Sequence, residues 1–380
     1  MKAVAAFLTT HHQRHWTRLT EWSRDTLRAR PEPVSDEAAR SEATALLRLL
    51  GSAGHLEPIA AQDLRALCLL REAVADASPL ADAIIAIQAL GATPIVRAGT
   101  DEQRARWLAD ITAGRMMTAF AMTEPDAGSD VASMRTAAVR DGSDWILNGE
   151  KHLISNAGLA DLYLVFAKTS PDQGSRGITV FLVPADTPGL SFTGAQVMAA
   201  AHPLGSLRFS DCRVADEGRL GPIDQGFKLG MATLDQIRPS VGAAACGLAA
   251  RALDEASVHA RQRQQFGQRL ADMPIVREKI GRMATELDAA RLLVYRAAWE
   301  MDTEPGRHST SAAMAKSFAT EMAQRVVDDA VQIVGGLGVL VGHPVERLYR
   351  SVRALRIYEG ATDIQRLIVA GAHLDEAPRP

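Results

Sequence analysis

The hydrophobic pattern of this 380-residue chain changes its period twice, and that change limits the folds the chain can adopt. Residues 1–115 follow a helical period, in which Thr100 begins a capping box and Gly114 marks a helix end. Residues 116–222 alternate short β-type runs with Gly, Pro, Asp and Ser. From residue 223 to residue 380 the helical period returns. We therefore expect a mostly α protein of the α+β class, with an N-terminal helical domain (1–115), a central β-domain (116–222) and a C-terminal helical bundle (223–380).

The central segment has the pattern of strands joined by tight turns, which predicts an antiparallel sheet and not βαβ units. Asn148-Gly149 directly follows a β-type run and is typical of a two-residue hairpin loop. The predicted strands are 116–122, 144–147, 162–167, 178–183 and 207–214. The amphipathic runs of the last segment predict helices over 225–264, 274–301, 309–334 and 361–373, with a C-cap cluster at 335–338.

Composition and charge exclude several classes of protein. The formal net charge is −3, and neither a basic stripe nor metal-ligand spacing occurs, so we expect no nucleic acid and no bound metal. The three cysteines are far apart, which fits a reducing compartment better than a disulfide framework. No apolar run approaches the ~20 residues that span a bilayer, and no signal-peptide cleavage site follows the N-terminal apolar run. We expect a soluble, cytoplasmic enzyme without a membrane partner.

Two loops have the composition of ligand-binding segments. Residues 122–130 follow a predicted strand and combine Gly, Pro and hydroxyl side chains, which offers N–H groups and hydroxyls to a polar ligand or a phosphate. Residues 261–267 end a long helix with arginines and a phenylalanine. Such arginines either complement the helix dipole or hold a phosphate beside an aromatic ring that contacts a ligand. The residues alone do not decide between these two interpretations.

Glu359 is the candidate general base of the chain. It lies in the segment 357–366, between a β-type run and a helix start, and Gly360 follows it. A carboxylate at this place is either an ordinary helix-start residue, favoured by the positive end of the helix dipole, or a base on a flexible turn. Physical reasoning on the residues leaves both interpretations open.

Taken together and in this order, the segments 122–130, 261–267 and 357–366 resemble the acyl-CoA dehydrogenase family, and its medium-chain branch most closely. The likeness runs from about Ala92 to Leu374. It implies an N-terminal helical domain, a central antiparallel β-domain and a C-terminal four-helix bundle, assembled as a homotetramer or homodimer with FAD. It also implies dehydrogenation of acyl-CoA to trans-2-enoyl-CoA, with electron-transferring flavoprotein as the electron acceptor.

The resemblance also implies the site residues. Glu359 matches the base that takes the α-proton of the thioester while the β-hydrogen leaves as hydride to flavin N5, and Ser155 matches a hydroxyl that bonds the flavin near N5. The residues implied to contact FAD are Phe120, Met122, Thr123, Gly128, Ser129, Leu153, Ser155, Arg263, Phe266, Gln332, Gly335, Gly336, Ala361 and Asp363. The residues implied to contact the thioester are Ser129, Asp235, Arg238, Tyr358 and Gly360.

Several residues depart from the family pattern. Leu153 replaces a tryptophan that packs beside the flavin, and Ala361 replaces a threonine that contacts FAD. The stretch 198–205 lacks the family's loop at the CoA end, so the acyl group is carried either by CoA or by an acyl carrier protein. Ile87 matches the floor of the acyl pocket, where its bulk predicts a shorter or altered pocket.

Three alternatives to a dehydrogenase follow from the same residues. An acyl-thioester oxidase that reduces oxygen is compatible with the lost tryptophan at Leu153. Monooxygenase and nitroalkane oxidase relatives do not keep the Tyr-Glu-Gly base, so Glu359 speaks against them. A non-catalytic flavin-binding protein is opposed by the presence of Glu359, Arg238, Ser129 and Arg263 together.

Overall fold

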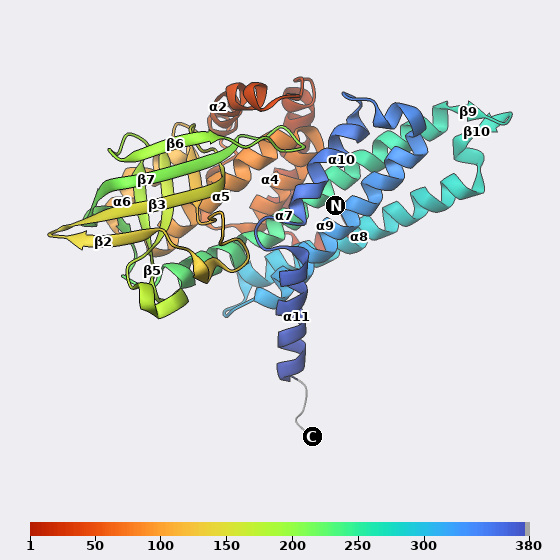
Figure 1. Ribbon diagram of the computed structural model, residues 1–380. Coiled ribbons are helices and arrows are strands. Elements are labelled where there is room, and N and C mark those ends of the chain that lie inside the picture. Colours follow the sequence, from red (N-terminus) through yellow and green to blue (C-terminus); the bar gives the residue numbers. More distant parts are fainter. Residues whose placement is uncertain (377–380) are drawn as a thin grey trace. The chain divides into compact units, whose positions relative to one another are not determined.

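The computed structural model describes residues 1–376, with helices at both ends of the chain and a sheet between them in sequence (Figure 1). The helices are α1 (Thr10–Trp22), α2 (Asp36–Ser52), α3 (Glu57–Ala61), α4 (Leu64–Ala77), α5 (Pro79–Ala98), α6 (Asp101–Thr112), α7 (Gly226–Gln262), α8 (Pro274–Thr303), α9 (Ser309–Val334), α10 (Pro344–Leu355) and α11 (Thr362–Glu376). The strands are β1 (Thr118–Ala121), β2 (Ala137–Asp141), β3 (Asp144–Ser155), β4 (Leu162–Lys168), β5 (Ile178–Pro184), β6 (Leu190–Ala195), β7 (Leu204–Ala215), β8 (Arg219–Leu220), β9 (Gln264–Gln265) and β10 (Gln268–Arg269). The predicted fold class is confirmed.

The chain forms two compact units, each assembled from separate stretches of sequence. The first, here called the helical unit, comprises residues 1–32, 63–82 and the chain from residue 235 onward. The second, the sheet unit, comprises residues 33–62 and 83–234. The division into three consecutive domains stays a prediction, and each unit is described by itself below.

The sheet unit is built on a sheet with strand order β6-β7-β3-β2-β4-β5-β8, and β1 pairs with β4 beside this path. Neighbouring strands run antiparallel, except that β1 and the first residue of β2, Ala137, pair with β4 in parallel. β4 and β5 are buried over all but their last residue, which explains their unbroken apolar sequences. The predicted antiparallel β-domain is thus confirmed, with one parallel strand added to it.

The predicted hairpin loop at Asn148-Gly149 is wrong. β3 continues through this dipeptide, and the turn to β2 lies earlier, between Asp141 and Asp144. Asn148 instead exchanges two hydrogen bonds with Asp211 of β7, at 2.8 and 3.1 Å, where the register between the strands shifts. The Asn-Gly dipeptide therefore lies at a bulge within β3 and not in a turn. Its hydrogen bonds with Asp211 join it to the neighbouring strand β7.

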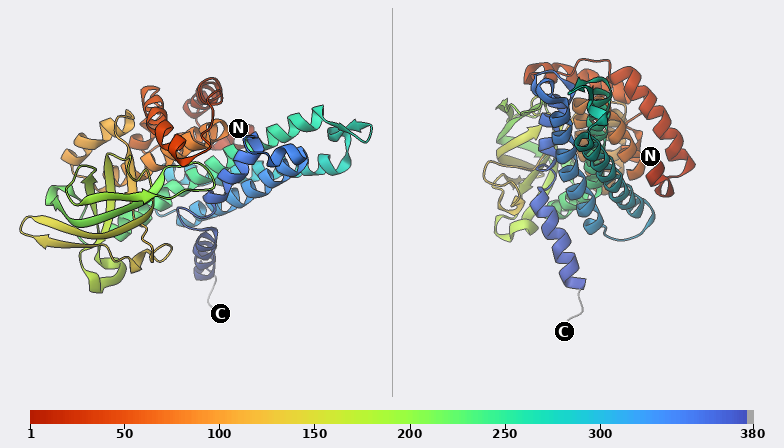
Figure 2. Two further views of the ribbon diagram at one scale, coloured as in Figure 1. Left: turned by 45° about the horizontal axis from the view of Figure 1, so that its top comes forward. Right: turned by 90° about the vertical axis from the view of Figure 1, so that its right-hand side faces the viewer.

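The helical unit contains the long C-terminal helices, and Figure 2 shows α8 and α9 running side by side. α10 and α11 also pack on α9. Gly242 of α7 lets these helices approach closely, because a Cβ there would lie 2.7 Å from Val294 of α8. The four helices predicted for this segment correspond to α7, α8, α9 and α11, and Gly335 ends α9 as expected, with a φ of 72°.

The prediction of a β-type run before Glu359 is wrong, because the helix α10 occupies that segment. Its buried residues Val345, Leu348, Val352 and Leu355 are spaced by three and four positions, which is the period of a helix. The turn that carries Glu359 therefore joins two helices.

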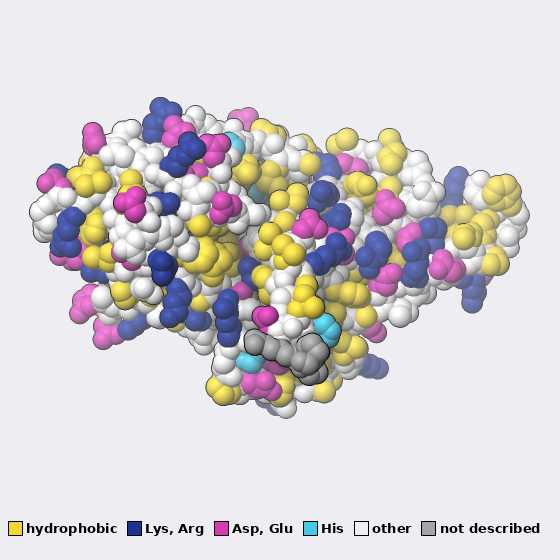
Figure 3. Space-filling model, turned by 60° about the horizontal axis from the view of Figure 1, so that its bottom comes forward, with side chains coloured by type: hydrophobic (Ala, Val, Ile, Leu, Met, Phe, Trp, Pro, Cys, Tyr) yellow, Lys and Arg dark blue, Asp and Glu magenta, His cyan; other side chains and the backbone are white. Residues whose placement is uncertain are grey.

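α5 is long and apolar enough to cross a membrane by length and composition, which corrects the expectation that no segment reaches that length. However, 78% of its most apolar window is buried within the structure, as in the core helix of a globular protein. On the face shown in Figure 3, Lys and Arg side chains are scattered together with Asp and Glu among hydrophobic and uncharged groups.

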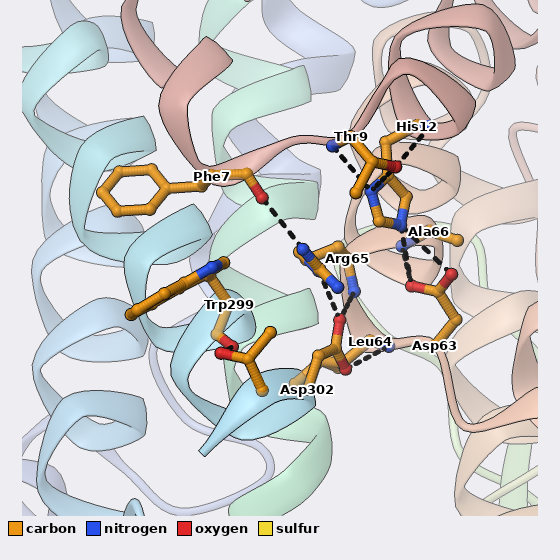
Figure 4. A network of polar contacts seen from close by, with 10 residues as sticks. Phe7, Thr9, His12, Asp63, Leu64, Arg65, Ala66, Trp299 and Asp302 are labelled. Carbon is orange, nitrogen blue, oxygen red and sulfur yellow. Dashed lines mark hydrogen bonds and ion pairs between the residues drawn. The ribbon is translucent and has the colours of Figure 1, made fainter.

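A polar network fixes the N-terminal helices of the helical unit (Figure 4). Asp302, near the end of α8, accepts hydrogen bonds from the backbone of Leu64 and Arg65 at 3.0 and 3.1 Å and pairs with Arg65 Nε at 2.7 Å. Asp63 caps the same helix, α4, at Ala66 N and contacts His12 of α1 at 3.1 Å. The start of α4 is thus tied to α1 and α8. The same helix carries the buried cation Arg71.

Replacement of Asp302 by Ala should lower the free energy of unfolding by about 1–3 kcal/mol, because two backbone donors at the start of α4 lose their acceptor. Asp302→Asn should cost less, since its amide oxygen still accepts. Thermal or urea unfolding of the FAD-loaded protein measures the change. Asp288→Ala, which removes a carboxylate whose side chain is 60% exposed, is the control. Equal stability of Asp302→Ala and Asp288→Ala would contradict this role.

Candidate active site

Glu359 lies in the turn between α10 and α11, where Glu359 and Gly360 have positive φ angles of 54° and 90°. A non-glycine residue in this conformation costs on the order of 1–3 kcal/mol and persists only where its surroundings impose it. Glycine is favoured at position 360 by its φ of 90°, which L side chains rarely adopt, and a Cβ there would also lie 2.3 Å from Nε2 of Gln365. That amide donates to the Gly360 carbonyl oxygen at 3.1 Å, which anchors the turn to α11.

Lys316 of α9 also holds this turn. Its side chain is fully buried, with 0% of its surface exposed. Nζ donates a hydrogen bond to the carbonyl oxygen of Tyr358 at 2.6 Å and another to that of Gly360. Glu359 is therefore flanked by two peptide carbonyls that bind one ammonium group.

α7 supplies the predicted substrate residues Asp235 and Arg238, which are both buried. Arg238 pairs with the Asp235 carboxylate through Nη1 and donates from Nε to the Glu359 carbonyl oxygen at 3.3 Å. The same carboxylate accepts from the Ser309 hydroxyl and lies 3.3 Å from Nη2 of Arg307, whose side chain is largely exposed. The helical unit thus brings together the predicted base and the predicted thioester residues Asp235, Arg238 and Gly360.

Arg71 of α4 is a third buried cation near this turn. Its guanidinium pairs with Asp82 through Nε at 2.8 Å and Nη2 at 3.0 Å, and Nη1 donates to the Ser240 hydroxyl at 3.0 Å. A bidentate pair of this kind fixes the orientation of both side chains. Its positive charge acts on Tyr358 and Glu359, so the predicted base faces cations from three helices.

The carboxylate of Glu359 is electrostatically prepared for proton transfer. The residue is partly exposed, yet its Oε2 is closed to solvent and has no hydrogen-bond partner among the described residues. Burial raises the pKa of Glu359 above its ordinary value, although Arg71, Lys316 and Arg238 pull it down. Burial also lowers the pKa of Lys316 to about 8, so its ammonium group remains mostly protonated at neutral pH. A carboxylate with a raised pKa binds a proton more readily, as a general base must.

The sheet unit joins the predicted flavin residues at the ends of β1 and β3. The backbone N–H of His152 donates to the Thr123 carbonyl oxygen at 2.9 Å, which holds the start of the loop against β3. Leu153 has a φ of 55° and a side chain that is 52% exposed. The phenyl ring of Phe120 on β1 packs against that of Phe166 on the paired strand β4, with centroids 4.8 Å apart.

Ser155 is held by a histidine that the sequence analysis assigned no role. Nε2 of His202 lies 2.7 Å from the Ser155 hydroxyl, and Nδ1 is buried without a partner among the described residues. Burial lowers the pKa of His202 to about 4, so its imidazole is neutral at pH 7. The Ser155 hydroxyl therefore has a fixed neighbour and retains hydrogen-bonding capacity for a ligand.

A buried ion pair supports the loop 122–130. Lys151 is 0% exposed and pairs with Glu124 at 2.7 Å, and its Nζ also donates to the Met122 carbonyl oxygen at 3.1 Å. Glu124 accepts from the backbone of Arg135 and Thr136 at 2.6 and 3.0 Å. The loop's Gly128 and Ser129 are exposed, and a Cβ at Gly128 would meet no atom within 4 Å. This loop is consequently rigid at its base and open at its tip.

The remaining predicted cofactor residues of the helical unit lie in three places. Arg263 and Phe266 lie at the β9–β10 hairpin, where Phe266 is 94% exposed with a φ of 53°. Gln332, Gly335 and Gly336 lie at the end of α9, and Ala361 and Asp363 lie at the start of α11. No hydrogen bond among the described residues joins the first two groups to the turn of Glu359. No group of His, Cys, Asp and Glu within the described chain has metal-binding geometry.

Three of the predicted site residues other than glycine have positive φ angles. These are Leu153, Phe266 and Glu359, among the few non-glycine residues in the described chain with positive φ. Conformations of this kind cluster at functional sites, where the fold imposes them. This backbone evidence does not depend on the chemistry of the side chains. It favours a functional role for all three positions.

Sequence reasoning missed Lys316, Arg71 and His202. For Lys316 a signal was present, because the lysine falls on the stripe of small residues Ala312, Ala315 and Ala319 that faces the core of the unit. A lysine on such a stripe must find acceptors when the helix packs, since a buried ammonium without them is unfavourable. No comparable pattern in the sequence marks His202.

Three family models match successive parts of the chain. They describe the N-terminal domain of acyl-CoA dehydrogenase over residues 16–115, its middle domain over 119–212 and its C-terminal domain over 224–374. A probable acyl-CoA dehydrogenase, fadE25 of Mycobacterium leprae, is 39% identical over 312 residues, which are 81% of this chain and 80% of that protein.

Two solved structures have the same fold over nearly their whole length. Butyryl-CoA dehydrogenase from Megasphaera elsdenii is 30% identical, with a TM-score of 0.88 over 97% of this chain and 99% of that one. The prolyl acyl carrier protein oxidase AnaB is 26% identical, with a TM-score of 0.88 over 96% of this chain and 99% of that one.

Replacement of Glu359 by Gln should raise the melting temperature at pH 8 and change it little at pH 5. The pKa of Glu359 is raised in the folded state, so its contribution to stability is complete below the unfolded value and is lost as the pH rises through the folded value. The neutral amide avoids this loss. Calorimetry at both pH values measures the difference, with Glu286→Gln, in an ion pair with Arg325, as the control. A stabilisation that is equal at both pH values would contradict the prediction.

Proposed function

This chain belongs to the acyl-CoA dehydrogenase family, and within that FAD-dependent oxidoreductase activity on acyl-CoA we propose that Glu359 is the base that removes the α-proton of the thioester. The observation that carries the proposal is the Oε2 atom of Glu359, which is closed to solvent and has no partner within the described structure. A buried carboxylate oxygen left unpaired is costly, so its retention favours a role in which substrate supplies the missing contact.

In the proposed reaction, Glu359 takes the α-proton as the α-C–H bond breaks, and a double bond forms between Cα and Cβ. FAD, when bound, accepts the β-hydrogen with its electron pair as hydride. The proton on Glu359 leaves to solvent after the product does. The α-C–H is a very weak acid. The raised pKa of Glu359 therefore lowers the free energy of proton transfer from the α-carbon to its carboxylate.

Asp235 and Arg238 are proposed to hold the thioester beside this base. Arg238 contacts the Glu359 carbonyl oxygen directly and is itself oriented by Asp235. A ligand bound to either residue is therefore held at a fixed position relative to the turn of Glu359. Tyr358, Gly360 and Ser129 complete the proposed substrate contacts.

The residues of the sheet unit fit a flavin. An isoalloxazine ring requires apolar surface for its face and hydrogen-bonding groups at its edge. The half-exposed Leu153 offers the first, and the oriented Ser155 hydroxyl offers the second. We propose that these residues hold the ring with Phe120, Met122, Thr123, Gly128 and Ser129, and that Ala361 and Asp363 contribute from α11.

We further propose that the enzyme is a cytoplasmic homotetramer or homodimer that passes electrons to an electron-transferring flavoprotein. Phe266 is 94% exposed at the β9–β10 hairpin, and packing of this ring against a second copy would remove apolar surface from water. In that assembly Arg263 and Phe266 would contact the FAD of the neighbouring chain, together with Gln332, Gly335 and Gly336. The described chain also exposes Val339, Leu340 and Val341 just after the end of α9.

An acyl-thioester oxidase, or an enzyme acting on an acyl carrier protein, is the second candidate. The structural likeness to an acyl carrier protein oxidase favours it, as does the exposed Leu153 where the family has a tryptophan. Substrate-reduced oxidase would reoxidise in air within seconds, whereas the dehydrogenase would stay bleached until an electron-transferring flavoprotein is added. The same acyl group offered on CoA and on acyl carrier protein separates the two carriers.

Glu359→Gln should reduce the rate of anaerobic flavin bleaching by at least ~10²-fold, because general-base catalysis contributes about 10²–10⁴-fold. Stopped-flow absorbance of the flavin with a panel of acyl-CoAs, from short straight to branched and cyclic, measures the rate. Glu286→Gln serves as the control for loss of a carboxylate elsewhere. Bleaching of Glu359→Gln at the wild-type rate would refute the assignment.

Ile87→Gly should extend the acceptable chain length, because a smaller residue deepens the proposed pocket floor. The same bleaching panel measures the profile for wild type, Ile87→Ala and Ile87→Gly, and we expect a graded shift toward longer acyl groups. A glycine in a helix costs about 1 kcal/mol relative to alanine, so the alanine variant separates pocket size from helix stability. An unchanged profile in both variants would show that Ile87 does not limit the pocket.

A further inference from the structure

Lys316 is a fully buried cation that forms no ion pair among the described residues and binds only backbone carbonyls around Glu359. Its Nζ donates to the carbonyl oxygens of Tyr358, at 2.6 Å, and Gly360. A buried lysine ordinarily pairs with a carboxylate, because removing an ammonium group from water costs several kcal/mol. Lys316 instead donates to two peptide carbonyls, and its charge also acts on the nearby Glu359 carboxyl group without a direct ion pair.

The first of these peptides links Tyr358 to Glu359. Its C=O and N–H point in opposite directions, because the bond is trans and planar. With the oxygen held by Lys316, the N–H of Glu359 points away from the ammonium group. This N–H has no acceptor among the described residues, although the neighbouring N–H of Tyr358 bonds to Ala354 at 3.1 Å.

A cation at the oxygen of a peptide group draws electron density from its nitrogen and makes the N–H a stronger donor. Hydrogen bonds linked in series polarise one another, and the effect is larger in a buried site than in water. The N–H of Glu359 is therefore fixed in direction, strengthened and left available for a ligand oxygen.

We infer that Lys316 is a positioning residue that orients and polarises the Glu359 N–H as the donor to the thioester carbonyl oxygen. This inference rests on the proposed function, in which negative charge develops on that oxygen as the α-proton leaves. The side chain of Glu359 takes the proton, and its backbone, through Lys316, stabilises the charge left behind. Donors fixed in advance stabilise such charge without reorganisation during the reaction.

The competing explanation is that Lys316 only anchors the turn. Gln365 already anchors it, with an amide that donates to Gly360 at 3.1 Å, and Arg238 contacts the Glu359 carbonyl oxygen at 3.3 Å. Neither residue contacts the Tyr358 carbonyl oxygen. A purely structural lysine would change stability and substrate affinity, whereas a polarising lysine changes the electronic state of the bound thioester.

Three variants separate these roles. Lys316→Met removes charge and donor, and Lys316→Gln removes the charge but keeps a donor. Lys279→Met is the matched control, because Lys279 lies in the same unit and pairs with Asp329 at 2.5 Å. Each is made in the wild type for kinetics and in Glu359→Gln, where the thioester persists, for infrared spectroscopy of bound butyryl-CoA labelled with ¹³C at its carbonyl.

With butyryl-CoA, Lys316→Met should bleach the flavin at least ~10-fold more slowly, since loss of a whole oxyanion donor costs about 10²–10³-fold. The labelled carbonyl stretch should move to higher frequency in Lys316→Met and, by a smaller step, in Lys316→Gln, while Lys279→Met matches the parent. Hydrogen exchange of residues 354–362 should also accelerate in Lys316→Met. A FAD-loaded Lys316→Met protein that keeps the parent's carbonyl frequency would overturn the inference, whatever its rate.

The proposed function has a separate readout. If wild-type protein never bleaches with butyryl-CoA or the wider panel, the dehydrogenase assignment fails. If wild type bleaches and Lys316→Met bleaches at the same rate with the same carbonyl frequency, only the role of Lys316 fails.

Discussion

The burial of one carboxylate is the constraint on which the helical unit depends. A charged group removed from water costs several kcal/mol unless nearby charges offset the loss. Arg71, Lys316 and Arg238, from three different helices, provide that compensation for Glu359. The burial still dominates, so the pKa of the carboxyl is raised and the group remains a base. α4, α7 and α9 must converge on one turn for this balance to exist, and the capping network at Asp302 places the first of them.

The sheet unit also uses buried polar groups to fix the backbone, here beside the candidate flavin residues. Its candidate flavin loop must present hydroxyls and N–H groups at its tip without collapsing into the sheet. The buried pair of Lys151 and Glu124 holds the base of the loop through backbone bonds, while Gly128 leaves its tip unobstructed. Ser155 is set in the same way by the neutral His202. In both units, buried polar groups act on the backbone next to the candidate site residues, and so fix where those residues lie.

The structure shows the surroundings of the residues that depart from the family pattern. Leu153, where the family has a tryptophan, has a left-handed backbone and an exposed side chain, which is compatible with the contact to a ligand that we propose for it. Lys316 of α9 and Gln365 of α11 hold the turn of Glu359 and Gly360 from two helices. The surroundings of the proposed base therefore keep their buried cations, whereas the proposed flavin-contacting position 153 carries a different residue from the family pattern.

Hydrophobic period alone determined the order of helices, sheet and helices, because period reports which face of a segment is buried regardless of its partner. Local chemistry likewise placed the Thr100 capping box and the end of α9 at Gly335, where the deciding bonds lie within a few residues. The quoted motifs identified Glu359 as a candidate through resemblance. Tertiary structure alone decided that Asn148 forms a bulge and that Lys316 binds the carbonyl of Tyr358, 42 residues away. Such contacts join segments distant in sequence, and no local pattern records which distant acceptor a buried donor will meet.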